Sequence, residues 1–363
     1  MDNKSASEFG RKITGHTPKL LTIKLSLPGV ETLDLAQFLG PMRSLESLPF
    51  TLHVNKHVDN PDYWFVVEGF EQDDSEARID KSRIIFLGAE AGHPPDFWLR
   101  DEAQRDFLSQ FGGTRGHLAR YEDGAEASTP FLPWMLFANH GASIFSPKTK
   151  SQIDYIWSDV PPTKSSRKIS MFCSNQQWNP YHKRRFDFAK KLKEVFPDHI
   201  DWFGNGVNNV ATKFEGLHPY RHSLVLENGN GANLITEKLI DAYLGWCFPI
   251  YSGASNVHDH FPQESLLRLD LEDFNKSCKQ IEAILGDESH WESHLDSLVE
   301  SRRLARRHFN FLDRLGDLAN ALEHRSLPQS SQLVRLKPLQ SFEPRKKVSY
   351  RLALAAYNRF FRS

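Results

Sequence analysis

The sequence predicts an α/β protein with two domains. At 363 residues and 41.7 kDa, the chain is longer than one ordinary hydrophobic core supports. Short apolar runs alternate with amphipathic segments of helical period, which is the pattern of βαβ units with parallel strands. Pro161 and Pro162, inside a turn-rich segment, predict a linker between the domains. The predicted boundaries are residues 1–160 for the first domain, 166–327 for the second, and 328–363 for a basic, aromatic tail.

The first domain has weak periodicity, so its strand order stays open. Short apolar runs predict strands at residues 19–27, 64–67 and 83–87, and a helix is expected at 102–111.

The second domain has a clearer pattern of strand, helix and strand. We expect parallel pairing, because a strand that is followed by a helix and another strand returns in the same direction. Thr236 is the expected N-cap of the central helix. Strands are predicted at 169–173, 200–203, 223–226 and 248–251, and helices at 181–195, 236–246, 275–285, 290–315 and, in the tail, 350–361.

Composition excludes several classes of protein. With 45 basic and 46 acidic residues, the net charge of −1 argues against a general nucleic-acid binder. The three cysteines form no CxxC pair, so neither a disulfide framework nor a structural zinc site is expected, and no HExxH motif predicts another metal site. There is no apolar run of roughly 20 residues, and the polar stretch 1–19 lacks the apolar core of a signal peptide. A cytoplasmic location is the simplest expectation.

The most informative motif runs from Leu226 to Lys238. A strand ends there in a polar loop with glycines, and a helix then begins with Thr-Glu-Lys. A helix N-terminus at the carboxyl end of a parallel strand is suited to bind phosphate, and Lys238 adds a full positive charge. Glu237 is placed to accept hydrogen bonds from sugar hydroxyls. The residues alone are equally compatible with a capped helix that carries an exposed Glu-Lys pair.

Two other groups are weaker candidates. Asn175 follows a predicted strand, and Arg184 and Arg185 come about ten residues later, where an arginine can hold a diphosphate with two hydrogen bonds. A solvated basic helix face explains the same arginines. Glu90, with His93 nearby, follows the predicted strand 83–87 and suits a general base, although most such glutamates are surface residues.

The second domain resembles the α-1,3/4-fucosyltransferases of glycosyltransferase family 10. The resemblance covers residues 169–274 and rests on Glu227-Asn228, on Thr236-Glu237-Lys238 and on the strand that ends before Gly253. It implies a GT-B fold with two Rossmann-like lobes. It also implies GDP-fucose as donor substrate, bound by the second lobe without a metal or another cofactor.

The resemblance also assigns roles to residues. Asn228, Glu237 and Lys238 match donor-binding positions, and Arg185 matches the family arginine, with Arg184 as the alternative. Glu90 is the best match to the base, with His93 or another carboxylate next. Asn175 and Gly253 are additional candidates near the donor.

These roles imply an inverting transfer of fucose to a hydroxyl of a glycan or glycolipid, in an α-1,3-type linkage, as in the glycosylation of proteins or the synthesis of lipopolysaccharide O-antigen. The alternatives are a non-catalytic relative that binds a nucleotide sugar or carbohydrate, and a transferase that uses another nucleotide sugar.

The carboxyl-terminal tail is basic: residues 335–363 contain eight basic side chains and one acidic side chain. Leucine and aromatic residues accompany these charges, so a peripheral contact with the anionic inner face of a membrane is one expectation. A helix that packs back across the two lobes is the other.

Overall fold

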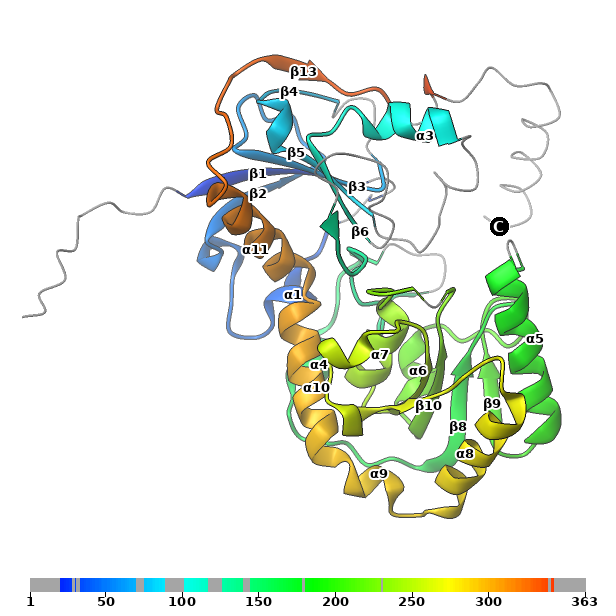
Figure 1. Ribbon diagram of the computed structural model, residues 1–363. Helices are drawn as coiled ribbons and strands as arrows, with labels where there is room; N and C mark the ends of the chain where they lie inside the picture. The colour runs from blue at the N-terminus through cyan, green and yellow to red at the C-terminus, as the bar shows by residue number, and fades with distance from the viewer. Residues whose placement is uncertain are drawn as a thin grey trace, which may run out of the picture.

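The computed structural model describes residues 20–27, 30, 33–69, 75–88, 101–116, 126–139, 144–177, 180–229, 231–338 and 341–342. They form two lobes, each built on a parallel β-sheet with helices packed around it (Figure 1). The α/β class and the two-lobed GT-B arrangement expected from the sequence are confirmed.

The first lobe contains a six-stranded sheet in the order β2-β1-β3-β5-β6-β7, and every neighbouring pair in it is parallel. All five side chains of β3 are buried, as expected for a strand inside a sheet that is covered on both faces. The elements of this lobe, up to the connection between the lobes, are β1 (Leu21–Ser26), α1 (Ala36–Leu39), β2 (Phe50–Val54), β3 (Tyr63–Val67), β4 (Glu76–Arg78), β5 (Ile84–Leu87), α3 (Asp101–Leu108), β6 (Gly113–Gly116), β7 (Glu126–Ala127) and α4 (Lys150–Trp157).

The second lobe contains a five-stranded parallel sheet in the order β12-β11-β10-β8-β9. The expected parallel pairing is confirmed for β10 and β11, which are joined through α7. The elements are β8 (Ser166–Phe172), α5 (Pro180–Val195), β9 (Ile200–Phe203), α6 (Lys213–Leu217), β10 (Tyr220–Leu226), α7 (Glu237–Leu244), β11 (Phe248–Ser252), β12 (Leu267–Arg268), α8 (Phe274–Gly286), α9 (His290–Ser293) and α10 (Leu295–His308).

The chain then returns to the first lobe. The prediction of one continuous helix over 290–315 was wrong, because Asn310 begins a new helix, α11 (Phe311–Glu323), by accepting hydrogen bonds from the backbone N–H groups of Leu312 and Asp313. Arg314 on α11 donates to backbone carbonyls of the first lobe, and β13 (Leu333–Arg335) pairs antiparallel with β4. Helix α11 and strand β13 therefore contact the first lobe, although they follow the second lobe in the sequence.

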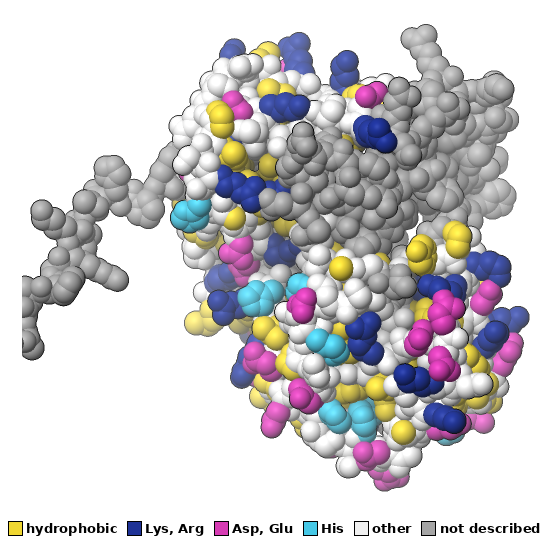
Figure 2. Space-filling view, in the orientation of Figure 1, with side chains coloured by type: hydrophobic (Ala, Val, Ile, Leu, Met, Phe, Trp, Pro, Cys, Tyr) yellow, Lys and Arg dark blue, Asp and Glu magenta, His cyan; other side chains and the backbone are white. Residues whose placement is uncertain are grey.

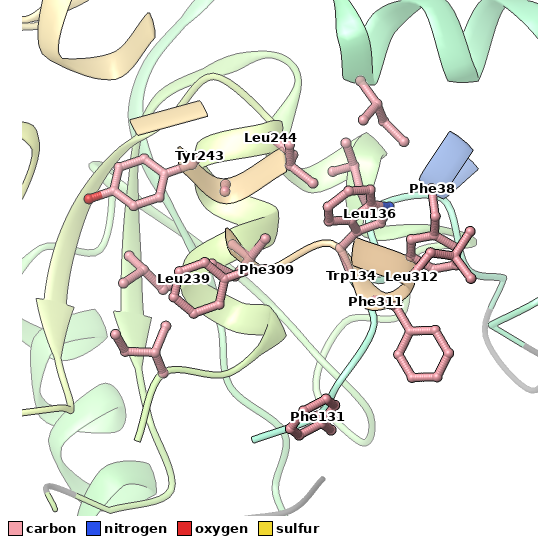
Figure 3. Close-up of a cluster of buried hydrophobic side chains, with 14 of the residues drawn as sticks. Phe38, Phe131, Trp134, Leu136, Leu239, Tyr243, Leu244, Phe309, Phe311 and Leu312 are labelled. Atoms are coloured by element: carbon pink, nitrogen blue, oxygen red, sulfur yellow. The ribbon is translucent and has the colours of Figure 1, made fainter. Parts of the chain in front are cut away.

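One hydrophobic core connects the two lobes and fixes the position of α7. Leu239 and Tyr243 on α7 belong to the same buried cluster as Phe38 on α1 and Phe311 on α11. Figure 3 shows this cluster, with Trp134 and Leu136 between the helices of the two lobes. Because α7 is packed against this shared core, its amino-terminal end has a defined position relative to both lobes.

The carboxyl-terminal end of α7 is held by a buried arginine. Arg302 on α10 is fully buried and donates to the carbonyl oxygens of Tyr243 and Leu244, the last residues of α7. Its other terminal nitrogen donates to the carbonyls of Tyr155 and Ile156 in α4, at 3.1 and 3.0 Å. One guanidinium thus joins α4, α7 and α10.

The surface agrees with the balanced charge of the sequence. Basic and acidic side chains are interspersed on the face of the second lobe seen in Figure 2. The three cysteines are unpaired. Among the described residues, no helix has both the length and the apolar character needed to cross a membrane.

Candidate donor site at the interlobe edge of the second sheet

The carboxyl ends of the second sheet border a cavity between the lobes. This interlobe cavity has a volume of about 360 Å³ and is lined by Arg185, Glu237 and Lys238 from the second lobe and by Met135 and other residues of the connecting segments. Open α/β sheets bind ligands at this edge. The structure therefore brings together three of the residues that the sequence singles out.

Arg185 and Asn228 form the first part of the site. Arg185, on α5, is 4% exposed, and its guanidinium donates to the side-chain oxygen of Asn228, which follows β10. The Nε of Arg185 is buried and has no hydrogen-bond partner among the described residues. A buried guanidinium donor without a partner is costly unless a ligand accepts from it. An anion such as a diphosphate fits this position.

Lys238 is held at the amino-terminal end of α7 by carboxylates. Its ammonium lies 3.6 Å from Oε2 of Glu227 and 3.2 Å from Oε1 of Glu237. Glu227 in turn accepts hydrogen bonds from the N–H and hydroxyl of Thr236, at 2.9 and 2.6 Å. Thr236 is the N-cap of α7, as predicted. The Thr-Glu-Lys motif is thus locked to the end of β10, and Lys238 borders the interlobe cavity.

Glu237 is kept ionised by two lysines. Burial alone would raise its pKa, but the nearby positive charges of Lys238 and Lys213 lower the pKa to about 2. Its carboxylate lies 3.4 Å from the ammonium of Lys213. At neutral pH it accepts hydrogen bonds and donates none, which suits contact with hydroxyl groups of a sugar or a ribose.

Lys213 and Asp241 are parts of the site that the motifs did not indicate. They form an ion pair of 2.8 Å, and Asp241 also accepts a 2.8 Å hydrogen bond from the N–H of Met135, in the segment that leaves the first lobe. Burial raises the pKa of Asp241, against the opposing effect of Lys213. Asp241 lies one helical turn after Glu237, which is a weak sequence signal, whereas nothing near Lys213 in the sequence indicates its role.

A second cavity, of about 310 Å³, is lined by residues at or after the ends of β10, β11 and β12. This strand-end cavity is lined by Arg184, Glu227, Gly253, Glu272 and other polar residues. Arg184 forms an ion pair with Glu272, so its charge is already partnered. Arg185 rather than Arg184 borders the interlobe cavity.

Gly253 and Asn175 both lie close to neighbouring groups of the second lobe. A Cβ on Gly253 would lie 2.3 Å from the hydroxyl of Tyr251 and 2.5 Å from Cγ of Glu227, so a larger residue would displace the buried glutamate. Asn175, which follows β8, donates to the carbonyl of Gly206 at 3.4 Å and so lies against the turn after β9. Glu90 and His93, the candidate bases, lie outside the described residues.

The two parallel α/β lobes have the arrangement of a GT-B fold, and cationic side chains lie where the second sheet borders the interlobe cavity. The family model "Glycosyltransferase family 10 (fucosyltransferase) C-term" matches residues 162–309. Residues 162–309 therefore match a glycosyltransferase family 10 domain, and the resemblance drawn from the motifs is confirmed.

Two curated relatives agree with this assignment. The chain is 36% identical over 93 residues to the alpha-(1,3)-fucosyltransferase FucT of Helicobacter pylori. The matched segment is 26% of this chain and 19% of that enzyme. It is 29% identical over 132 residues to an alpha-(1,4)-fucosyltransferase of Arabidopsis thaliana, and this matched segment is 30% of this chain and 31% of the relative. The chain thus matches less than a third of the length of either relative.

Solved structures of α1,3-fucosyltransferase are also similar. For one with GDP the TM-score is 0.47 and the identity 19%, over 80% of this chain and 84% of that one. For one with GDP-fucose the TM-score is 0.45 and the identity 18%, over 94% and 91% of the respective chains.

Proposed function

We propose that this protein transfers fucose from GDP-fucose to a hydroxyl of a glycan or glycolipid acceptor. The observation that carries the proposal is the buried Arg185 guanidinium, whose Nε lacks a partner among the described residues, next to Lys238 and the amino-terminal end of α7 at the interlobe cavity. The family domain lies over these residues. One similar α1,3-fucosyltransferase structure contains GDP-fucose, and this chain is proposed to use the same donor.

The site supplies the positive charge that the leaving group requires. When the bond between the sugar carbon and the phosphate oxygen breaks, its electron pair stays on GDP, and the diphosphate gains negative charge. Arg185, Lys238 and the partial positive charge of the α7 N-terminus stabilise that charge without a metal ion. Among the described residues, no group of three or more His, Cys, Asp or Glu side chains is arranged to hold a metal ion.

The transfer is proposed to invert the sugar carbon in one displacement. The acceptor hydroxyl attacks that carbon as the phosphate leaves, and a base of the first lobe takes the hydroxyl proton. Glu90 is the proposed base and His93 the next candidate. Since base and donor belong to opposite lobes, closure of the lobes would complete the site. The proposed linkage is of the α-1,3 type, on a glycan of a protein or of lipopolysaccharide.

A panel of labelled nucleotide sugars, each offered with several glycan acceptors, tests this function. We expect transfer from GDP-fucose and thermal stabilisation by millimolar GDP. Stabilisation by GDP without transfer from any donor would favour a non-catalytic relative, and transfer from another nucleotide sugar would correct the donor.

The Glu90→Gln variant tests the base. We expect it to lose most of the transfer activity while its affinity for GDP stays unchanged, because the amide cannot take the proton. An unchanged transfer rate would exclude Glu90, and His93→Gln would be measured next.

We propose that the protein is cytoplasmic and contacts the inner face of the membrane through its basic tail. The transfer reaction would take place there. The proposal rests on the eight basic residues and the aromatic residues of segment 335–363. Cosedimentation with phosphatidylglycerol vesicles, before and after deletion of residues 345–363, tests it. Equal binding by both forms would contradict it.

A further inference from the structure

A pocket remote from the donor cavity gathers four arginines where the lobes meet. Its volume is about 360 Å³, and it is lined by Arg43, Trp157, Arg303, Arg306, Arg307 and Asp313. Arg43 follows α1 in the first lobe, Trp157 ends α4, and the other three arginines occupy the last two turns of α10. We call it the arginine pocket. None of its residues lines the interlobe or the strand-end cavity.

The indole of Trp157 forms a fixed wall of the pocket. Its Nε1 donates to the carbonyl of Gln37 at 2.9 Å. The ring also lies against Gly40, where a Cβ would come within 2.6 Å of Cε2 of the indole. The guanidinium carbons of Arg43 and Arg306 lie 5.9 and 5.7 Å from the ring centroid. The aromatic face therefore holds two cations in place before any ligand binds.

Two of the arginines use most of their donors on the protein. Arg43 pairs with Asp313 at 2.6 Å and donates to the carbonyls of Phe38 and Leu39. Arg306 is buried, donates to the carbonyl of Trp157 at 2.5 Å and pairs with Asp159. These side chains supply charge and shape to the pocket, but they have few donors left for a ligand.

The other two arginines retain donors. Arg303 uses its Nε and one terminal nitrogen on Asp159, at 3.0 and 2.9 Å, which leaves the second terminal nitrogen. The side chain of Arg307 is exposed, and its guanidinium has no ion pair or hydrogen bond within the ranges that the structure describes. Four guanidinium groups face two carboxylates, Asp159 and Asp313, so the pocket keeps an excess of two positive charges.

From this geometry we infer that the arginine pocket binds a small anion that carries a phosphoryl group. A phosphate dianion neutralises two positive charges, and planar guanidinium groups bind its oxygens in pairs. Arg303 and Arg307 provide the direct hydrogen bonds. Because Arg43 comes from the first lobe and Arg303 and Arg307 from α10, the charge of the bound anion offsets the repulsion between the cations of these parts. Arginines near the end of α10 also complement its helix dipole, and the experiment has to separate the two roles.

Binding of inorganic pyrophosphate, measured by calorimetry on the full chain, tests the inference. Saturating GDP is present throughout, so that the donor cavity is occupied. We expect one further pyrophosphate to bind, and the double variant Arg303→Gln/Arg307→Gln to weaken this binding by about tenfold or more. The control Lys190→Gln/Lys191→Gln removes two charges from exposed positions on α5 and should change the affinity by less than about twofold.

Two further measurements sharpen the result. Trp157→Phe should keep the affinity but lose the change in tryptophan fluorescence on binding, which locates the ligand. Phosphatidylcholine vesicles with and without phosphatidylglycerol identify the source of the phosphate. Loss of vesicle binding in the arginine double variant indicates a lipid headgroup, and unchanged vesicle binding indicates a soluble phosphorylated ligand.

Two results would overturn the inference. One is the absence of pyrophosphate binding beyond the GDP-occupied site, and the other is an equal loss of affinity in the arginine and lysine double variants. Since neither Arg303 nor Arg307 belongs to the donor site, failure of this inference leaves the proposed transferase function unaffected.

Discussion

The two ends of helix α7 use buried charges in different ways. At the amino-terminal end, Lys238 meets Glu227 and Glu237, and the nearby Arg185 keeps a buried nitrogen without a partner among the described residues. At the carboxyl-terminal end, the cations are Arg302 and Lys164, and both donate to backbone carbonyls. The Nε of Arg302 is also buried without a partner among the described residues, but Arg302 lines neither the interlobe nor the strand-end cavity.

This difference distinguishes cations that are suited to bind a ligand from cations that stabilise the fold. Lys164 donates to the carbonyls of Leu217, His218 and Gly245 at 3.1, 2.8 and 2.6 Å, which uses all three of its hydrogens. A cation saturated by carbonyls has no capacity left for a ligand and holds the chain together. A cation that keeps a buried donor next to a cavity is suited to bind one.

Arg185→Lys should give the largest effect, and the effect should be on activity. Lysine keeps the charge but loses the planar fork, so we expect fucose transfer to fall by about 100-fold or more, as for other residues that stabilise a developing negative charge. The measurement is a transfer assay with GDP-fucose at saturating acceptor. Arg167→Lys, at an exposed position that pairs with Glu288, is the control and should retain full activity. Equal rates for the two variants would remove Arg185 from the site.

Arg302→Met should mainly affect stability. It leaves the carbonyls at the ends of α4 and α7 without their buried donor, and we expect the free energy of unfolding to fall by about 3 kcal/mol or more. Urea denaturation followed by circular dichroism measures this loss. Arg303→Met, one residue along and 55% exposed, is the matched control and should cost less than about 1 kcal/mol. A stable Arg302→Met protein that no longer binds GDP would reverse the roles assigned to the two ends.

For Lys164 we predict a smaller effect on the free energy of unfolding, and this effect depends on pH. Burial lowers its pKa from 10.5 to about 8. Between about pH 8 and 10.5 the unfolded chain therefore binds more protons at this lysine than the folded protein, so this group makes the folded state more stable as pH rises.

The measurement is the free energy of unfolding of the wild type and of Lys164→Met across that range. We expect the difference to change by on the order of 1 kcal/mol in favour of the wild type as pH increases. Lys168→Met, at an exposed lysine, should give a constant difference. If the free energy of unfolding has the same slope against pH with and without Lys164, the lowered pKa of this lysine is contradicted.

The sequence predicted the second lobe better than the first. The predicted helix 181–195 corresponds to Pro180–Val195, where Arg185, Phe188 and Leu192 are buried at helical spacing, and the predicted strand 200–203 corresponds to Ile200–Phe203. β6 was missed because its sequence, Gly-Thr-Arg-Gly, has little strand propensity. Gly112, just before β6, is needed there for another reason: a Cβ on it would lie 2.2 Å from the carbonyl oxygen of Lys81.

Local motifs indicated several residues that the structure brings close together, and their roles in binding stay predictions. Arg185, Asn228, Glu237 and Lys238 stand in recognisable segments, and the structure places Arg185, Glu237 and Lys238 at one cavity, with Asn228 bound to Arg185. Lys213 is 28 residues from Asp241 and becomes its partner only through packing of the lobe, so no local pattern could indicate it. The return of α11 to the first lobe likewise depends on contacts between distant segments, such as that of Arg314 with Thr129.

Calorimetric titration of GDP into Lys238→Met and Lys164→Met tests the central claim most directly, because the two lysines lie at opposite ends of α7. The account predicts that Lys238→Met loses at least about tenfold in GDP affinity, since a charge on the diphosphate loses its counter-charge. Lys164→Met should bind GDP as the wild type does. Unchanged affinity in Lys238→Met, or an equal loss in both variants, would contradict the claim that the amino-terminal end of α7 holds the donor.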